Sequence, residues 1–143
     1  MSDLFDKHTE ITQEECEAYA RELTNSTVTA VSWQGAHSYT LLTGSNVIVQ
    51  FRSKDSPLDI KTTELAKFTH PHLAPKTTYH GLMTSSSVTV WIMEALPGRG
   101  YLYSLNKLSQ DQLELTVSGM ARCVMGILPS IPPVDIVVAD IIL

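Results

Sequence analysis

Near the start of the chain, hydrophobic residues recur at the spacing of a helix. The i, i+3, i+4, i+7 positions that line one helical face hold Cys16, Tyr19, Ala20 and Leu23. Just before them, Thr12 and Glu15 form a Thr-x-x-Glu capping box, which is typical of a helix N-terminus. We therefore predict a helix that follows a polar lead over residues 1–10 and ends at Thr24-Asn25, with the Cys16 thiol in the core.

From Val28 to Met93 the pattern changes to short runs rich in β-branched and aromatic residues. Such runs, bounded by turn residues, predict β-strands, and they lie at residues 28–33, 38–42, 46–52, 79–83 and 87–93. Thr43-Gly44-Ser45 joins the second run to the third and predicts a hairpin. In the third run, alternation places residues 48, 50 and 52 on one face of the strand and residues 47, 49 and 51 on the other.

A second helix is predicted between the third and fourth strands. Ser56 is its expected N-cap, with Pro57 at the first helical position and Asp59 at the third. The helix ends at His70-Pro71, because the residue before a proline avoids the helical region. One face of this helix is lined by Leu58, Leu65 and Phe68.

A third helix begins at Ser109, which forms a second capping box with Gln112, and ends at Pro129. Its apolar stripe consists of Leu113, Val117, Met120, Ala121, Val124 and Leu128. The order along the chain is helix, three strands, helix, two strands, connector and helix. This order predicts an α+β fold with a five-stranded antiparallel sheet and one helix packed on it, preceded by an N-terminal helix.

Composition and charge narrow the class of protein. The chain has 143 residues, about one domain, and its 43 % hydrophobic and 17 % charged residues are typical of a globular protein. A net charge of −5 with scattered Lys and Arg argues against a nucleic acid or an anionic membrane as partner. No apolar stretch reaches the ~20 residues of a membrane helix. Two cysteines and a polar start predict a cytoplasmic protein.

Four segments carry candidate nucleotide chemistry. They are the turn Gln34–Ser38 between the first two strands, the third strand Val47–Arg52, Glu64 in the second helix, and the segment Trp91–Gly98. In this order and spacing they resemble the small lobe of the protein-kinase-like fold. The closest resemblance is to the aminoglycoside phosphotransferase and choline-kinase-like family, including its fungal-type members, and it covers residues 11–126.

The resemblance implies an ATP site in this lobe. Its nucleotide-binding residues would be Gly35, His37, Ser38, Arg52, Glu64, Met93, Glu94 and Leu96. The first three belong to the loop that covers the nucleotide, and the last three to the hinge, whose backbone binds adenine. Arg52 would be the cation at the phosphates, held by the Glu64 carboxylate, and in the alternative register of the strand Gln50 takes its place. ATP and Mg²⁺ are the ligands that the resemblance implies.

The resemblance also implies a division of the chain. Residues 11–96 would form the small lobe, residues 97–128 the hinge and first helices of a truncated large lobe, and residues 129–143 an apolar tail. The family's catalytic loop, His-x-Asp-x-x-x-x-Asn, does not occur in the 143 residues, and no later Asp stands in the context of its magnesium ligand. We therefore expect a truncated phosphotransferase-like pseudoenzyme that is inactive alone, with no catalytic residue or metal ligand assigned.

Two other interpretations stay open. The chain is alternatively a non-catalytic module that binds a partner protein, or a second copy of itself, through the face left exposed by the missing lobe. It is alternatively a remnant gene product, associated with a biosynthetic pathway. The apolar tail, with its Pro-Pro break and its Ile/Val run, favours a truncated product, and an exposed run of this kind would be an aggregation hazard or a docking segment. The acceptor substrate is selected by the large lobe, so the sequence does not identify it.

Overall fold

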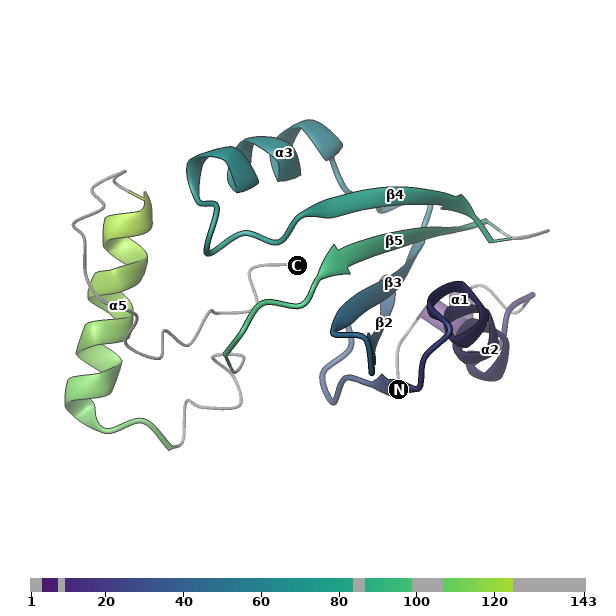
Figure 1. Cartoon of the computed structure of the whole chain (residues 1–143), viewed down its shortest axis with the longest axis horizontal. Helices are drawn as coiled ribbons and strands as arrows, with labels where there is room; N and C mark the ends of the chain where they lie inside the picture. The colour runs from purple at the N-terminus through teal and green to yellow at the C-terminus, as the bar shows by residue number, and fades with distance from the viewer. Residues whose placement is uncertain (1–3, 8–9, 84–86, 99–106, 125–143) are drawn as a thin grey trace. The chain divides into compact units, whose positions relative to one another are not determined.

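The computed structural model describes residues 4–7, 10–83, 87–98 and 107–124. The chain divides into two compact units, Met1–Leu96 and Pro97–Leu143. Its elements, labelled in Figure 1, are α1 (Leu4–Lys7), α2 (Gln13–Thr24), β1 (Val28–Ala30), β2 (Ser38–Thr43), β3 (Val47–Ser53), α3 (Ile60–Thr69), β4 (Thr77–Leu82), β5 (Val88–Glu94) and α5 (Gln110–Val124).

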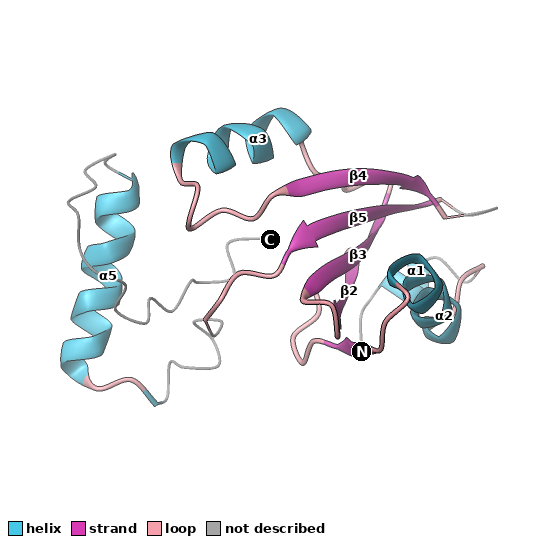
Figure 2. Cartoon of the chain, in the orientation of Figure 1, coloured by secondary structure: helices cyan, strands magenta, loops and turns pink. Residues whose placement is uncertain are grey.

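One antiparallel sheet organises the first unit. Its strand order is β1-β2-β3-β5-β4, so β3 and β5 lie next to each other at the centre although α3 and β4 separate them in the sequence (Figure 2). The predicted α+β class, the five antiparallel strands and the order of helices and strands are confirmed. The predicted turn 84–86 between β4 and β5 lies outside the described residues.

The predicted hairpin of β2 and β3 is confirmed, with Leu41 opposite Val49. The turn comes close to another segment at Gly44. A Cβ atom at Gly44 would lie 2.7 Å from the Thr27 hydroxyl oxygen. The hairpin turn therefore passes directly against the segment that enters β1, and the Gly44 N–H donates to the Thr27 carbonyl at 2.8 Å.

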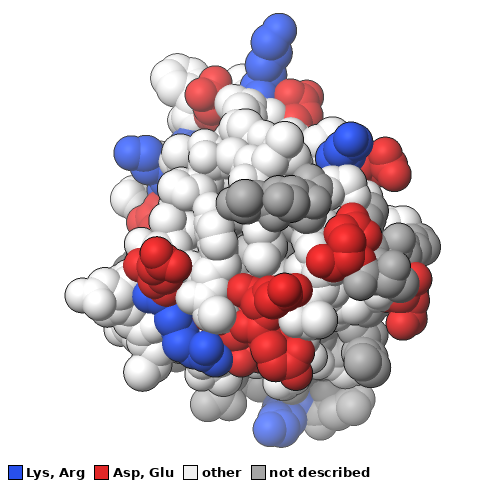
Figure 3. Space-filling view, turned by 90° about the vertical axis from the view of Figure 1, so that its right-hand side faces the viewer, with Lys and Arg blue, Asp and Glu red and all other residues white. Residues whose placement is uncertain are grey.

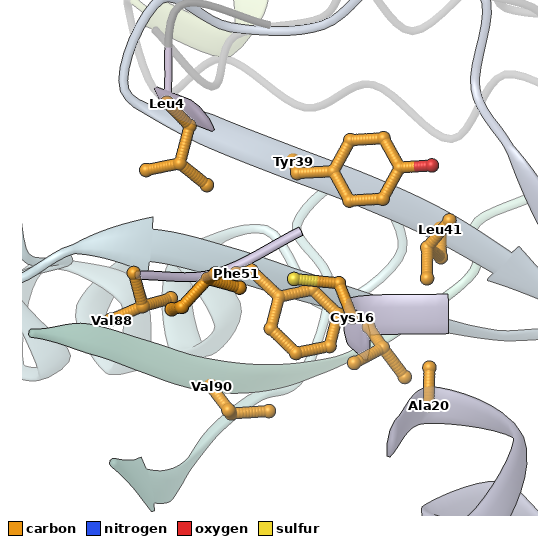
Figure 4. Close-up of a cluster of buried hydrophobic side chains, with 10 residues drawn as sticks. Leu4, Cys16, Ala20, Tyr39, Leu41, Phe51, Val88 and Val90 are labelled. Carbon is orange, nitrogen blue, oxygen red and sulfur yellow. The ribbon is translucent and has the colours of Figure 1, made fainter. Parts of the chain in front are cut away.

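The hydrophobic core lies between the sheet and the two N-terminal helices. Figure 1 shows α1 and α2 together beside β2 and β3, and α2 contacts β1 and β2. Every second residue of the central strands points to this side. Figure 4 shows the resulting cluster, which comprises Leu4, Ile11, Cys16, Ala20, Tyr39, Leu41, Val49, Phe51, Val88 and Val90.

Helix α2 forms as the sequence predicts. The Glu15 N–H donates to the Thr12 hydroxyl at 3.2 Å, and the Thr12 N–H donates to the Glu15 carboxylate at 2.8 Å, which completes the capping box. The helix ends at Asn25, whose φ of 47° is left-handed. Cys16 is fully buried, and burial with two nearby glutamates raises the pKa of its thiol to about 12. It is therefore a core residue, as predicted.

Two expectations about helices are wrong. The first ten residues are not simply a polar lead, because Leu4 on α1 is fully buried in the core and Phe5 packs edge-on against Tyr39. Helix α3 contacts β4 but buries none of its residues. Leu65 is 61 % exposed and Phe68 is 84 % exposed, so their apolar face is not covered by the sheet.

Helix α3 also starts three residues later than predicted. Its N-cap is Asp59, whose carboxylate accepts from the Lys61 N–H at 3.0 Å and from the Thr62 hydroxyl at 2.7 Å. The expected cap, Ser56, has another role: its carbonyl and hydroxyl oxygens both accept from the Arg52 guanidinium. Ser56 therefore binds Arg52, and Asp59 rather than Ser56 caps the helix.

In the second unit, α5 begins with the predicted capping box. The Gln112 N–H donates to the Ser109 hydroxyl at 3.3 Å, and the Ser109 N–H donates to the Gln112 side chain at 2.9 Å. Val117 and Met120 are exposed, so the predicted apolar stripe is not a buried one. The predicted continuation to residue 128 and the apolar tail 129–143 lie outside the described residues. Within the described segments, no helix is long and apolar enough to span a membrane.

Candidate functional site

The face of the sheet opposite the core carries a buried polar network centred on Arg52. The Arg52 side chain is only 4 % exposed. Its Nε and Nη2 donate to the carbonyl and hydroxyl oxygens of Ser56 at 2.9 and 3.2 Å, and its Nη1 donates to Gln50 Oε1 at 3.2 Å. Burial lowers the pKa of the guanidinium, which nevertheless stays charged at neutral pH.

The two alternatives for the strand-three position, Arg52 and Gln50, belong to this one network. Both side chains lie on the same face of β3, as the alternation predicts, and they bond to each other. Gln50 in turn donates to the Thr40 hydroxyl of β2 at 3.0 Å. The neutral amide therefore helps to orient the cation, and only Arg52 of the two brings a charge to this face.

Residues of β5 support Arg52 from the other side. Thr89 lies opposite Arg52, and its hydroxyl donates to the Arg52 carbonyl at 3.0 Å. The same hydroxyl accepts from the Trp91 indole N–H at 3.0 Å. The Trp91 ring packs against Tyr79 with ring centroids 5.0 Å apart. The sequence analysis did not identify these partners, because they are 27 or more positions from Arg52 along the chain.

The structure does not join Arg52 to Glu64. Glu64 is exposed on α3, and in the described part of the chain no carboxylate forms an ion pair with Arg52. Removing a charge from water costs several kcal/mol unless good partners replace the water. The Arg52 guanidinium is thus a buried cation whose described partners, Ser56 and Gln50, are all uncharged.

The end of the predicted nucleotide-covering loop lies beside Arg52. Ser38 is buried directly opposite Arg52 in the β2–β3 pair. The His37 carbonyl accepts from the Ser53 N–H at 3.1 Å. Gly35 and His37 are exposed. Ser38 therefore lies beside the predicted cation and His37 beside the next residue of β3, whereas Gly35 contacts Ser38.

The predicted hinge residues lie at the other end of β3. Met93 is buried opposite Ile48, on the same face of the sheet as Arg52, and Glu94 lies opposite Val47. Leu96 is half-buried. Ile48 and Arg52 are four positions apart along the strand, a distance of about 13 Å. The predicted site residues thus form two groups along one strand, with Glu64 in neither.

An ion pair links α3 to the end of β5. Lys67 Nζ donates to Glu94 Oε2 at 2.8 Å and to the Pro71 carbonyl at 2.8 Å, and the Lys76 N–H donates to the same Glu94 oxygen at 3.3 Å. These donors lower the pKa of the Glu94 carboxyl, with Lys67 the largest contributor. The helix-to-sheet ion pair therefore has its base on α3 and its acid on β5, the reverse of the predicted arrangement.

A surface depression of about 510 Å³ lies at this end of the sheet. It is lined by Asn46, Val47, Lys67, Lys76, Thr78, Ile92, Met93 and Glu94. It therefore contains two of the predicted hinge residues but does not extend to Arg52. Lys67 and Lys76 were not among the predicted site residues, because in the sequence they resemble ordinary charges at the end of a helix and in a loop.

Charge on the surface is mixed. Figure 3 shows several Asp and Glu side chains gathered near the lower centre of one face, with Lys and Arg spread around its rim. With a net charge of −5, an anionic ligand would depend on local cations rather than on the field of the whole molecule. Among the described residues, no three His, Cys, Asp or Glu side chains converge on a metal position. We therefore assign no magnesium ligand.

Comparison with known proteins identifies no family. A scan against protein-family models gives no match, and a search of the curated proteins finds no similar sequence.

Proposed function

We propose that the first unit binds ATP, as the small lobe of a phosphotransferase of the protein-kinase-like fold. The observation that carries this proposal is the buried Arg52 guanidinium, which has only uncharged partners among the described residues. An uncompensated cation inside a sheet is unfavourable without an anion, and phosphate oxygens accept paired hydrogen bonds from a guanidinium. The chemistry of this position thus favours a phosphate-bearing ligand.

The surroundings of Arg52 support the same proposal. The loop that ends at Ser38 reaches the sheet opposite Arg52, and the hinge residue Met93 lies about 13 Å further along the same face. In this proposal the loop covers the phosphates, Arg52 contacts them, and the backbone of Met93–Leu96 binds the base. The order of elements, with one helix between β3 and β4, agrees with the order in the small lobe that the sequence resembles.

Isothermal titration of the purified chain with ATP and with adenosine tests this proposal. We expect ATP to bind at least about tenfold more tightly, because a charged hydrogen bond to phosphate contributes ~1.5–3 kcal/mol. Adenosine measures the contribution of the base alone. Equal affinities, or no binding of ATP, would overturn the proposal.

The chain by itself is not expected to transfer phosphate. The 143 residues contain no His-x-Asp-x-x-x-x-Asn loop that could supply a catalytic base. Incubation with radiolabelled ATP, Mg²⁺ and a panel of small hydroxylated acceptors should therefore give no labelled product. A labelled acceptor would contradict the proposed inactivity while leaving ATP binding intact.

A second candidate function is self-association as a non-catalytic binding module. The observation that favours it is the exposed apolar face of α3, where Leu65 and Phe68 are 61 % and 84 % exposed. Light scattering should then show a mass above the 15.8 kDa of one chain that rises with concentration, and Phe68→Ser should abolish the rise. A constant monomer mass would exclude this candidate.

A further inference from the structure

The Gln34 side chain fills a gap in the sheet. Its Nε2 donates to the Val31 carbonyl at 2.8 Å and to the Thr40 carbonyl at 3.0 Å, and its Oε1 accepts from the Thr40 N–H at 2.7 Å. One side-chain amide thus bonds three backbone groups on two segments. Gln34 is half-buried, in contrast to Trp33 and Gly35 on either side, which are exposed.

The bonds of Gln34 replace one rung of the ladder between β1 and β2. Antiparallel neighbours that face each other in a hydrogen-bonded pair exchange two N–H to carbonyl bonds. The Val31 N–H still donates to the Thr40 carbonyl at 3.2 Å. The reciprocal bond is replaced, since the Gln34 amide lies between the Thr40 N–H and the Val31 carbonyl and bonds to both. The side chain therefore extends the sheet where the main chain of β1 turns away.

This arrangement pins the middle of the loop that joins β1 to β2. The segment between Val31 and Ser38 is held to the sheet at Gln34, which divides it into a span before Gln34 and a span after it. In the second span, the Ser38 N–H donates to the Gly35 carbonyl at 3.4 Å, and a Cβ atom at Gly35 would lie 2.5 Å from the Ser38 hydroxyl oxygen. Hydrogen bonds within the protein thus hold this loop at Gln34 and again between Gly35 and Ser38.

We infer that Gln34 is a positioning residue that holds the phosphate-covering loop in its binding conformation before ATP arrives. This inference rests on the proposed ATP site. Ordering a loop on binding lowers affinity, and a loop ordered in advance avoids that cost. Gln34 need not contact the nucleotide: it acts through the backbone of Val31 and Thr40, which fixes where Gly35 and His37 lie relative to Arg52.

The test compares Gln34→Ala with Gln13→Ala in the full chain. Gln13 is a matched control, because it is an exposed glutamine of the same unit whose amide donates to the Glu17 carboxylate and not to a strand of the sheet. Hydrogen exchange without nucleotide measures protection of the Thr40 amide, titration measures ATP and adenosine affinity, and urea unfolding measures stability. In Gln34→Ala we expect about five- to tenfold faster exchange at Thr40 and an ATP dissociation constant raised by a similar factor. Adenosine affinity should be unchanged.

The outcomes separate the effect of Gln34 on the loop from the existence of the ATP site. Unchanged exchange of the Thr40 amide in Gln34→Ala would show that Gln34 does not hold the loop, whatever the ATP affinity. Faster exchange with unchanged ATP affinity would overturn the positioning role. If the unaltered chain binds no ATP, the proposed function fails and the positioning role fails with it, while exchange at Thr40 still decides whether Gln34 pins the loop. An equal loss of protection throughout the sheet would show general destabilisation and also contradict the inference.

Discussion

The two faces of the sheet differ in what covers them and in what their residues do. One face carries Val49, Phe51 and Val90, which pack against α1 and α2 in an apolar core. The other carries Gln50, Arg52 and, from β5, Thr89, which are buried yet polar and bonded to one another or to the adjoining backbone. Consecutive residues of β3 are therefore both buried but differ in chemistry: one set is apolar, and the other is polar and hydrogen-bonded. Burial alone does not distinguish the two sets, whereas the chemistry of the alternate positions does.

The largest expected effect is on the apolar face. Phe51→Ala should lower the free energy of unfolding by ~3–5 kcal/mol, because it leaves a cavity in a fully packed core where Phe51 is completely buried. Urea unfolding followed by circular dichroism measures the loss. If the variant does not fold, Phe51→Leu should give a smaller, measurable loss.

Leu42→Ala is the matched control for this prediction. Leu42 lies on the opposite face of β2 and is 41 % exposed, so its truncation should cost much less than that of Phe51. Equal losses at the two positions would show that the face against α1 and α2 is not the main source of stability.

A second comparison concerns the helices. Thr12→Ala should destabilise the first unit by ~1 kcal/mol, because Thr12 caps α2, and α2 contributes Cys16 and Ala20 to the core. Asp59→Ala removes the cap of α3, which buries nothing. It should lower helicity locally and hardly change the urea midpoint. A larger midpoint shift for Asp59→Ala than for Thr12→Ala would contradict the assignment of α2 as the core helix.

The smallest expected effect concerns the Lys67–Glu94 pair and depends on pH. In the folded chain the pKa of the Glu94 carboxyl is lowered from its usual 4.5. The ionised carboxylate therefore stabilises the fold fully at pH values above 4.5. The unaltered chain should exceed Glu94→Gln in stability at neutral pH, and the difference should vanish as pH falls through the lowered pKa. Glu64→Gln is the control, because Glu64 has no described partner. A difference that persists in acid would contradict the ion pair.

Local sequence patterns predicted much of the structure on the apolar side of the sheet, because each of these features depends on residues that are close together in the sequence. The capping box of Thr12 and Glu15, the helical spacing through Cys16 and the hairpin at Gly44 each depend on neighbours in the sequence. Leu4 was missed because one buried residue in a four-residue helix has no periodicity to detect.

The second face was harder to predict, because its partners are distant or unusual. Arg52 was predicted as the cation and Ser56 as a helix cap, whereas the Ser56 oxygens accept from the Arg52 guanidinium. The Lys67–Glu94 pair joins residues 27 positions apart. Gln34 shows no signal in the sequence, since a glutamine in a turn is ordinarily a solvated side chain, whereas this one takes the place of a backbone rung.

The most direct test of the account is ATP binding by Arg52→Met, measured together with its stability. A methionine keeps the apolar stem and removes the charge, and urea unfolding measures what the loss of the hydrogen bonds to Ser56 and Gln50 costs in stability. Arg21→Met, which removes an exposed arginine of α2, is the control. The account predicts a cooperatively folded Arg52→Met chain whose ATP affinity falls at least about tenfold, with Arg21→Met unchanged. Binding of ATP by Arg52→Met at the affinity of the unaltered chain would contradict it.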